Sequence, residues 1–314
     1  MAVSTTAKLK SLRDLLAAKP HQDVLRLYLQ SHDTGLLQHA FLVTVHRKWS
    51  AHSPYHLTEL GITTYDRMRV NRGQPIMVGP HAEDLLRKVW SFHLILRPHA
   101  HLDFTTGSSL AAFHFGTTIY VSQEEALDLL HQIWHQPMDE ADLTKGMRPI
   151  VYMSFDDNDG LAKMRKAAFD FTPSSLSSTV AVLDAQNIPV QAKITRSQTA
   201  SYDYLLKQFK ITAFDVGNSG NAAMYATIIA ILSALRFEIY GSNGNKVSKP
   251  GRTGQSSSKA AHSVVQSLME WPTPPPPWGV TTYCWRCGIG EHRYEECPNT
   301  DLTAALMPLS TPRP

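Results

Sequence analysis

Residues 221–236 read NAAMYATIIAILSALR and contain the longest apolar stretch of this chain. Thr227 and Ser233 are the polar interruptions between Ala222 and Leu235. A helix that crosses a bilayer needs about 20 apolar residues, so this stretch is too short to span a membrane. A helix that is apolar around its whole circumference is typically buried. The stretch therefore predicts a helix inside a folded core.

The segments before this helix alternate between strand-like and helix-like patterns. Ser122 is followed three residues later by Glu125, and this capping-box spacing predicts a helix over about 123–135. The polar residues 184–187 separate two strand-like runs and predict a hairpin. Strands are predicted at 91–96, 113–121, 150–155, 179–183, 190–195 and 211–216. The body of the protein is therefore predicted to be α+β.

The cysteines lie together, whereas the charge is only mildly basic. The formal net charge is +3, so nucleic-acid affinity requires a local patch of cations. The three cysteines, Cys284, Cys287 and Cys297, lie within fourteen residues, which excludes an intramolecular disulfide framework. Clustered thiols beside a histidine indicate a metal site in a reducing compartment. With no signal-peptide pattern at the N-terminus, we expect a cytoplasmic or nuclear protein that is not secreted.

The segment 284–298 reads CWRCGIGEHRYEECP, with the spacing C-x2-C-x4-H-x4-C. Three thiolates and one imidazole match the tetrahedral ligand set that Zn2+ prefers. Gly288 allows the backbone to turn sharply after the second cysteine. So short a segment has no core of its own, so zinc must supply its folding energy, about 10–16 kcal/mol in zinc-finger peptides. The predicted zinc ligands are Cys284, Cys287, His292 and Cys297.

This segment resembles the retroviral-type CCHC zinc knuckle family of Gag nucleocapsid regions, retroelement proteins and cellular RNA-binding factors. The resemblance covers about 15 of the 314 residues. It departs from the family pattern at Glu291, where the family has glycine before the histidine. The resemblance implies binding of single-stranded RNA or DNA, with Trp285 and Tyr294 stacking on an unpaired base. The predicted cationic contacts to nucleic acid are Arg286, Arg293, Lys246, Lys249, Arg252 and Lys259.

The sequence predicts a folded body, a tether and a small metal-binding module. Residues 241–259 have the composition of a flexible linker, and the proline run 272–277 is typical of a stiff spacer or of a ligand for an adaptor domain. The predicted division is 1–88, a mainly helical N-terminal region; 89–240, an α+β domain; 241–282, a Gly/Ser/Lys-rich and then Pro-rich linker; 283–298, the zinc knuckle; and 299–314, a disordered tail.

Three functions are compatible with this layout. The leading hypothesis is a non-enzymatic protein similar to viral or retroelement capsid–nucleocapsid proteins, in which the body forms oligomers or a virion-like particle and the knuckle captures RNA. The second is a cellular RNA-processing or adaptor factor whose knuckle binds RNA or protein. The third is a nucleic-acid-acting enzyme with its active site in residues 90–240. No complete catalytic motif is recognisable, so no catalytic residue is assigned.

Overall fold

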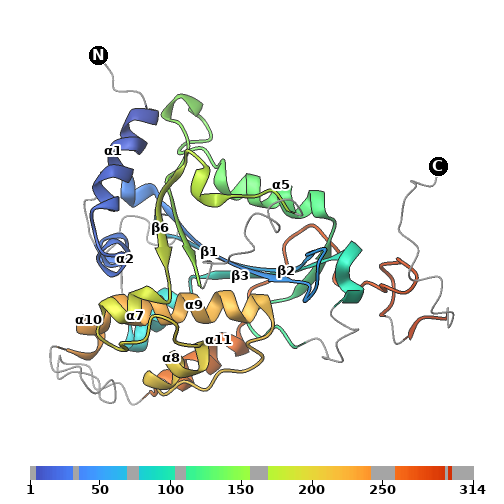
Figure 1. Cartoon of the computed structure of the whole chain (residues 1–314). Coiled ribbons are helices and arrows are strands. Elements are labelled where there is room, and N and C mark those ends of the chain that lie inside the picture. The colour runs from blue at the N-terminus through green and yellow to red at the C-terminus, as the bar shows by residue number, and fades with distance from the viewer. Residues whose placement is uncertain are drawn as a thin grey trace.

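The computed structural model describes residues 5–30, 35–68, 78–102, 111–155, 169–241, 259–293 and 296–298 (Figure 1). Its centre is a six-stranded sheet with the strand order β4-β3-β2-β1-β5-β6. The strands are β1 (Phe41–Trp49), β2 (Leu57–Asp66), β3 (Trp90–Leu96), β4 (Thr118–Val121), β5 (Ile150–Ser154) and β6 (Thr179–Asp184). The α-helices are α1 (Thr5–Ala17), α2 (His21–Gln30), α4 (Glu83–Leu86), α5 (Gln123–Trp134), α7 (Asn187–Gln191), α8 (Tyr202–Gln208), α9 (Ser219–Ala234), α10 (Arg236–Tyr240) and α11 (Ala261–Glu270).

The sheet mixes antiparallel and parallel pairs. Strands β1, β2 and β3 form an antiparallel meander, in which Val45 lies opposite Ile62. Strand β5 pairs in parallel with β1, and β6 pairs in parallel with β5. At the opposite end, β4 pairs in parallel with β3, so β4 and β6 are the two edge strands. This arrangement agrees with the predicted mixture of strands and helices.

Helix α9 is the buried helix that the apolar stretch predicts, and it lies across one face of the sheet (Figure 1). All of its residues are buried, and it contacts β1, β2 and β3. A Cβ atom at Gly61 would lie only 1.7 Å from the carbonyl oxygen of Ser219. Only glycine fits at this point, because the helix backbone touches the strand backbone.

The other face of the sheet is covered by α5, which begins at the predicted capping box. The Ser122 hydroxyl accepts a hydrogen bond from the Glu125 amide, and the Glu125 carboxylate accepts one from the Ser122 amide. The indole of Trp134, at the end of α5, is fully buried and donates to Thr179 Oγ1 at 3.0 Å. The predicted helix over 123–135 is therefore confirmed.

Several segments differ from the sequence prediction. Residues 211–216, predicted as a strand, lie between α8 and α9 and belong to none of the strands. Residues 41–49 and 57–66, which fall in the predicted mainly helical region, form the two longest strands. Residues 41–45 and 57–63 are buried on both faces of the sheet, so these runs lack the alternation that distinguishes a strand. The predicted second strand of the hairpin, 190–195, does not form, because helix α7 occupies residues 187–191. Pro189 lies inside this segment, and proline cannot donate a hydrogen bond to a strand ladder.

The C-terminal part of the chain packs on the body. Helix α11 lies inside the segment that the sequence predicts as linker, and it buries Ala261, Val264, Val265 and Leu268. No helix among the residues that the structure describes is long and apolar enough to cross a membrane.

Candidate functional site

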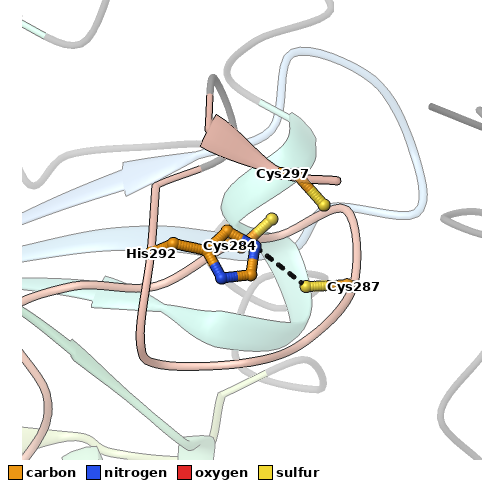
Figure 2. A group of neighbouring side chains, drawn as sticks. All are labelled: Cys284, Cys287, His292 and Cys297. Carbon is orange, nitrogen blue, oxygen red and sulfur yellow. Dashed lines mark hydrogen bonds between the residues drawn. The ribbon is translucent and has the colours of Figure 1, made fainter. Parts of the chain in front are cut away.

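The structure brings together the four residues of the C-x2-C-x4-H-x4-C motif (Figure 2). One donor atom from each of Cys284, Cys287, His292 and Cys297 lies within 4.8 Å of all the others. Cys287 Sγ and His292 Nε2 are 3.3 Å apart. In a tetrahedral zinc site with bonds near 2.3 Å, neighbouring sulfur ligands lie roughly 3.8 Å apart. The cluster therefore has the dimensions of a metal centre.

Local backbone geometry explains how fourteen residues form this cluster. The Gly288 amide donates to the Cys284 carbonyl at 2.8 Å, and the Cys284 amide donates to the Ile289 carbonyl at 2.9 Å. Gly288 has a φ of 77°, a value that glycine adopts without strain. Burial raises the pKa of the Cys284 thiol to about 11. A cation beside the sulfur would therefore be needed to hold Cys284 as a thiolate.

Of the two predicted base-stacking residues, the structure describes Trp285. Trp285 is partly buried and packs against a small cluster formed by Ile95, Ala100 and Tyr283. The Arg286 guanidinium lies 5.9 Å from the centre of the Trp285 ring, and Arg293 is exposed. The predicted partner ring, Tyr294, lies outside the described residues.

One of the predicted cations of the linker falls within the described residues. Lys259 is the one member of that group for which the structure gives a position. Its ammonium group pairs with Glu83 at 3.0 Å, and its carbonyl oxygen lies 3.1 Å from His81 Nε2. Lys259 therefore joins α11 to the body. Lys246, Lys249 and Arg252 fall outside the residues that the structure describes.

A buried ionic network lies where α9 begins. The Glu59 carboxylate, on β2, accepts hydrogen bonds from Lys48 Nζ at 2.7 Å, from His93 Nε2 at 3.0 Å and from the Ser219 amide at 3.0 Å. Burial alone would raise the pKa of Glu59, but the hydrogen bonds and charges of His93 and Lys48 outweigh burial and lower it to about 2. The side chain of Asn218 caps the helix by accepting from the Gly220 and Asn221 amides.

This network fixes α9 to the sheet and leaves Glu59 no free oxygen. Both carboxylate oxygens already bind protein donors, and Glu59 is only 2% exposed. The sequence pattern does not indicate this ionic network, because Lys48, Glu59 and His93 come from three strands. Their convergence depends on the strand register, which no local pattern encodes.

An open groove lies beside α7 and α8. No sequence pattern singled out its residues as a candidate site. Its volume is about 880 Å3, and Lys193, Arg196 and Tyr204 line it with Val190 and Ile194. The Tyr204 side chain is 47% exposed. Lys193 and Arg196 are exposed, and neither forms an ion pair with a carboxylate of the described part of the chain. Cations next to an exposed ring are the groups that bind a single nucleic-acid strand.

Comparison with solved structures gives a weak similarity that carries no conclusion about this chain. The chain is similar to the RNase domain of the yeast Pop2 protein, solved by X-ray crystallography, with 11% sequence identity and a TM-score of 0.29. The alignment covers 80% of this chain and 92% of that chain. This likeness is too distant to indicate a shared activity. No curated protein sequence matches the chain.

The family comparison corrects the identification made from the cysteine motif. Residues 41–233 match the family model DEDDh_C, described as "DNA polymerase III subunit epsilon-like, C-terminal domain". The assignment to the CCHC zinc knuckle family is therefore wrong, and so is the nucleocapsid-like function with its capsid and virion roles. The motif covers only a short C-terminal segment, whereas the match includes every strand of the sheet and α9. Because the matched region spans more than half of the chain, this protein belongs to the DEDDh_C family.

Proposed function

We propose that this protein acts on nucleic acid through its body, residues 41–233, which binds a single strand. The observation that carries this proposal is the family match, because it coincides with the sheet and α9 and not with the cysteine segment. The family is named for a subunit of a DNA polymerase, so nucleic acid is the substrate class that membership indicates.

The groove beside α7 and α8 is the surface whose chemistry best fits a strand. Lys193 and Arg196 supply two cations for phosphates, and the exposed ring of Tyr204 offers a face for one base. Base–aromatic stacking contributes about 1–3 kcal/mol per base and needs little sequence information. A duplex keeps its bases stacked on each other, so this surface favours single strands.

Charge reversal at the groove tests this assignment. The variant Lys193→Glu/Arg196→Glu should bind single-stranded oligonucleotides more weakly than the parent. It should also reduce the slope of log affinity against log salt by about 1.4, for two lost phosphate contacts. The matched control is Lys8→Glu/Lys10→Glu, which reverses two exposed lysines on α1. If both variants lose the same affinity, the groove is not the binding surface. If the parent binds neither RNA, single-stranded DNA nor duplex, the proposed function is wrong.

The divalent metal implied by the family does not fit the described residues. DEDDh exonucleases use divalent metal ions, typically Mg2+, which prefers oxygen ligands in octahedral geometry. Among the described residues, the single group of three or more candidate ligands that lie close together is the Cys3His cluster, whose donors are mainly sulfur. Glu59 is engaged by three protein donors. We therefore derive no hydrolytic step from these residues.

Hydrolysis of nucleic acid is a second candidate function, favoured by one feature of the sequence. Asp156, Asp157 and Asp159 follow β5 within the matched region and lie outside the described residues. Carboxylates are the ligands that Mg2+ prefers. Shortening of a labelled strand by the parent with Mg2+, and its loss in the triple Asp→Asn variant, would support hydrolysis. An uncut strand in both samples would leave strand binding as the function.

We also propose that the Cys3His cluster binds Zn2+. Three sulfurs and one imidazole nitrogen within 4.8 Å are the donor set and the spacing that structural zinc requires. Metal analysis of the protein, purified under reducing conditions, should give about one zinc per chain. Cys287→Ser should lose it, because a serine hydroxyl is a poor replacement for a thiolate. A zinc content that does not change in this variant would contradict the ligand set.

A further inference from the structure

The edge of the sheet at β4 is contacted by a segment that leads directly into the Cys3His cluster. We call residues 273–283 the C-terminal strap. The edge strand here is β4, and the strap residue Val280 pairs with Tyr120 through both backbone hydrogen bonds, at 2.7 and 3.2 Å. At the start of the strap, the Thr273 amide donates to the Phe115 carbonyl at 2.9 Å, and the Thr273 hydroxyl lies 2.7 Å from the Ser91 carbonyl oxygen.

Side chains also anchor the strap. Trp278 packs against the core cluster that lies under α5. The ring of Tyr283 is buried and lies 5.5 Å from the ring of Tyr120. Gly279, with a φ of 75°, brings the strap so close that a Cβ atom there would lie 3.2 Å from Val121 Cγ1. The strap is therefore fitted to the surface of β4.

The last anchor of the strap and the first metal ligand are neighbours in the sequence. Tyr283 precedes Cys284, which is fully buried. Trp285, on the other side of Cys284, packs in the same cluster as Tyr283 and Tyr120. Any atom that fixes the Cys284 sulfur therefore restricts both rings that hold the strap. Metal binding and docking of the strap share the same residues, so each favours the other.

We propose that zinc in the Cys3His cluster acts as a clasp, which holds the strap on β4 and closes this edge of the sheet. This inference rests on the zinc binding proposed above. Unpaired edge strands present amide and carbonyl groups that pair with other chains. Without zinc the strap loosens, the Tyr120 amide is exposed, and a second copy of this chain pairs with β4.

The experiment compares the full-length protein with its zinc and after treatment with a zinc chelator under reducing conditions. Four quantities are measured on each sample: zinc per chain, thermal unfolding of the body, amide hydrogen exchange in residues 118–121, and mass by light scattering. Chelation should speed exchange of the Tyr120 amide by about tenfold, as expected when one net hydrogen bond and its packing are lost. It should also lower the unfolding temperature and produce dimers or larger species.

Two substitutions separate docking of the strap from zinc binding. Tyr283→Ala removes the ring that packs on Tyr120 and should speed exchange in β4 while about one zinc per chain remains. Tyr283→Phe keeps the ring and should behave as the parent. Ile289→Ser changes an exposed residue of the same module and should also behave as the parent.

The outcomes distinguish the two proposals. If zinc is bound but its removal leaves exchange in β4, the unfolding temperature and the mass unchanged, the clasp is wrong and the zinc site stands. If the purified protein carries no zinc and takes up none, the zinc site itself is wrong, and the clasp is rejected with it.

Discussion

The carboxylate of Glu59 accepts a hydrogen bond from the backbone amide of Ser219 at 3.0 Å, which joins β2 to the first turn of α9. The two residues are 160 positions apart in the sequence. A negative charge at the start of a helix is favoured by the helix dipole. Lys48 and His93 stabilise that charge from the two neighbouring strands. This contact fixes the position of α9, all of whose residues are buried.

Glu59 should make the stability of the body depend on pH. Its pKa is lowered to about 2 in the folded protein from an ordinary value of 4.5. A lowered pKa stabilises the folded state above pH 4.5, and this contribution is lost as the pH falls from 4.5 to 2. The shift corresponds to about 3 kcal/mol. Glu59→Gln should therefore lower the free energy of unfolding at pH 7. It should also flatten the plot of that free energy against pH between pH 4.5 and 2, as measured by urea unfolding. Parallel curves for parent and variant would contradict this role.

Gly61 should not tolerate alanine. The added Cβ atom would lie 1.7 Å from the Ser219 carbonyl oxygen, a backbone atom that moves only with α9. We expect a loss of about 3 kcal/mol or more in the free energy of unfolding. Gly217→Ala is the control, because a Cβ atom there meets no atom within 4 Å. Thermal unfolding of both variants decides the question, and equal stabilities would show that α9 does not lie in close contact with β2.

Arg148 should be sensitive even to lysine. Its guanidinium binds both oxygens of Asp66, at 2.8 and 2.7 Å, its Nε donates to the His39 carbonyl, and its carbon lies 3.7 Å from the centre of the Phe41 ring. Lysine has no planar fork and no Nε–H, so it cannot reproduce the parallel pair to Asp66 together with the hydrogen bond to His39. Arg148→Lys should lower stability by about 1–2 kcal/mol in chemical unfolding. If Arg148→Lys is as stable as the parent, the paired hydrogen bonds between Arg148 and Asp66 contribute nothing to the free energy of unfolding.

Lys259 should affect stability slightly and nucleic-acid affinity not at all. Its ammonium group pairs with Glu83 and is half exposed, and such pairs contribute less than about 1 kcal/mol. Lys259→Met should therefore leave the affinity for a single-stranded oligonucleotide within about twofold of the parent, and a filter-binding titration measures it. If Lys259→Met loses as much affinity as Lys193→Glu/Arg196→Glu, Lys259 is part of the surface that binds nucleic acid.

The features that the sequence predicts well are local. The capping box at Ser122 and Glu125 and the buried α9 depend on residues that are close together in the chain. The four residues that gather in the Cys3His cluster likewise lie within fourteen positions of each other, with a sharp turn at Gly288 after the second cysteine. The cysteine pattern was nevertheless a poor guide to the family, because it describes a short segment and not the body.

Amino-acid sequence by itself determined where the buried helix lies, where α5 begins and which four residues cluster near the C-terminus. Only the tertiary structure decided that β5 and β6 run parallel to β1, that Lys48, Glu59 and His93 converge, and that the strap lies along β4. The physical reason is the range of the interactions. Helix periodicity and caps act over a few residues, whereas strand pairing and buried ion pairs join residues that only the completed fold brings into contact.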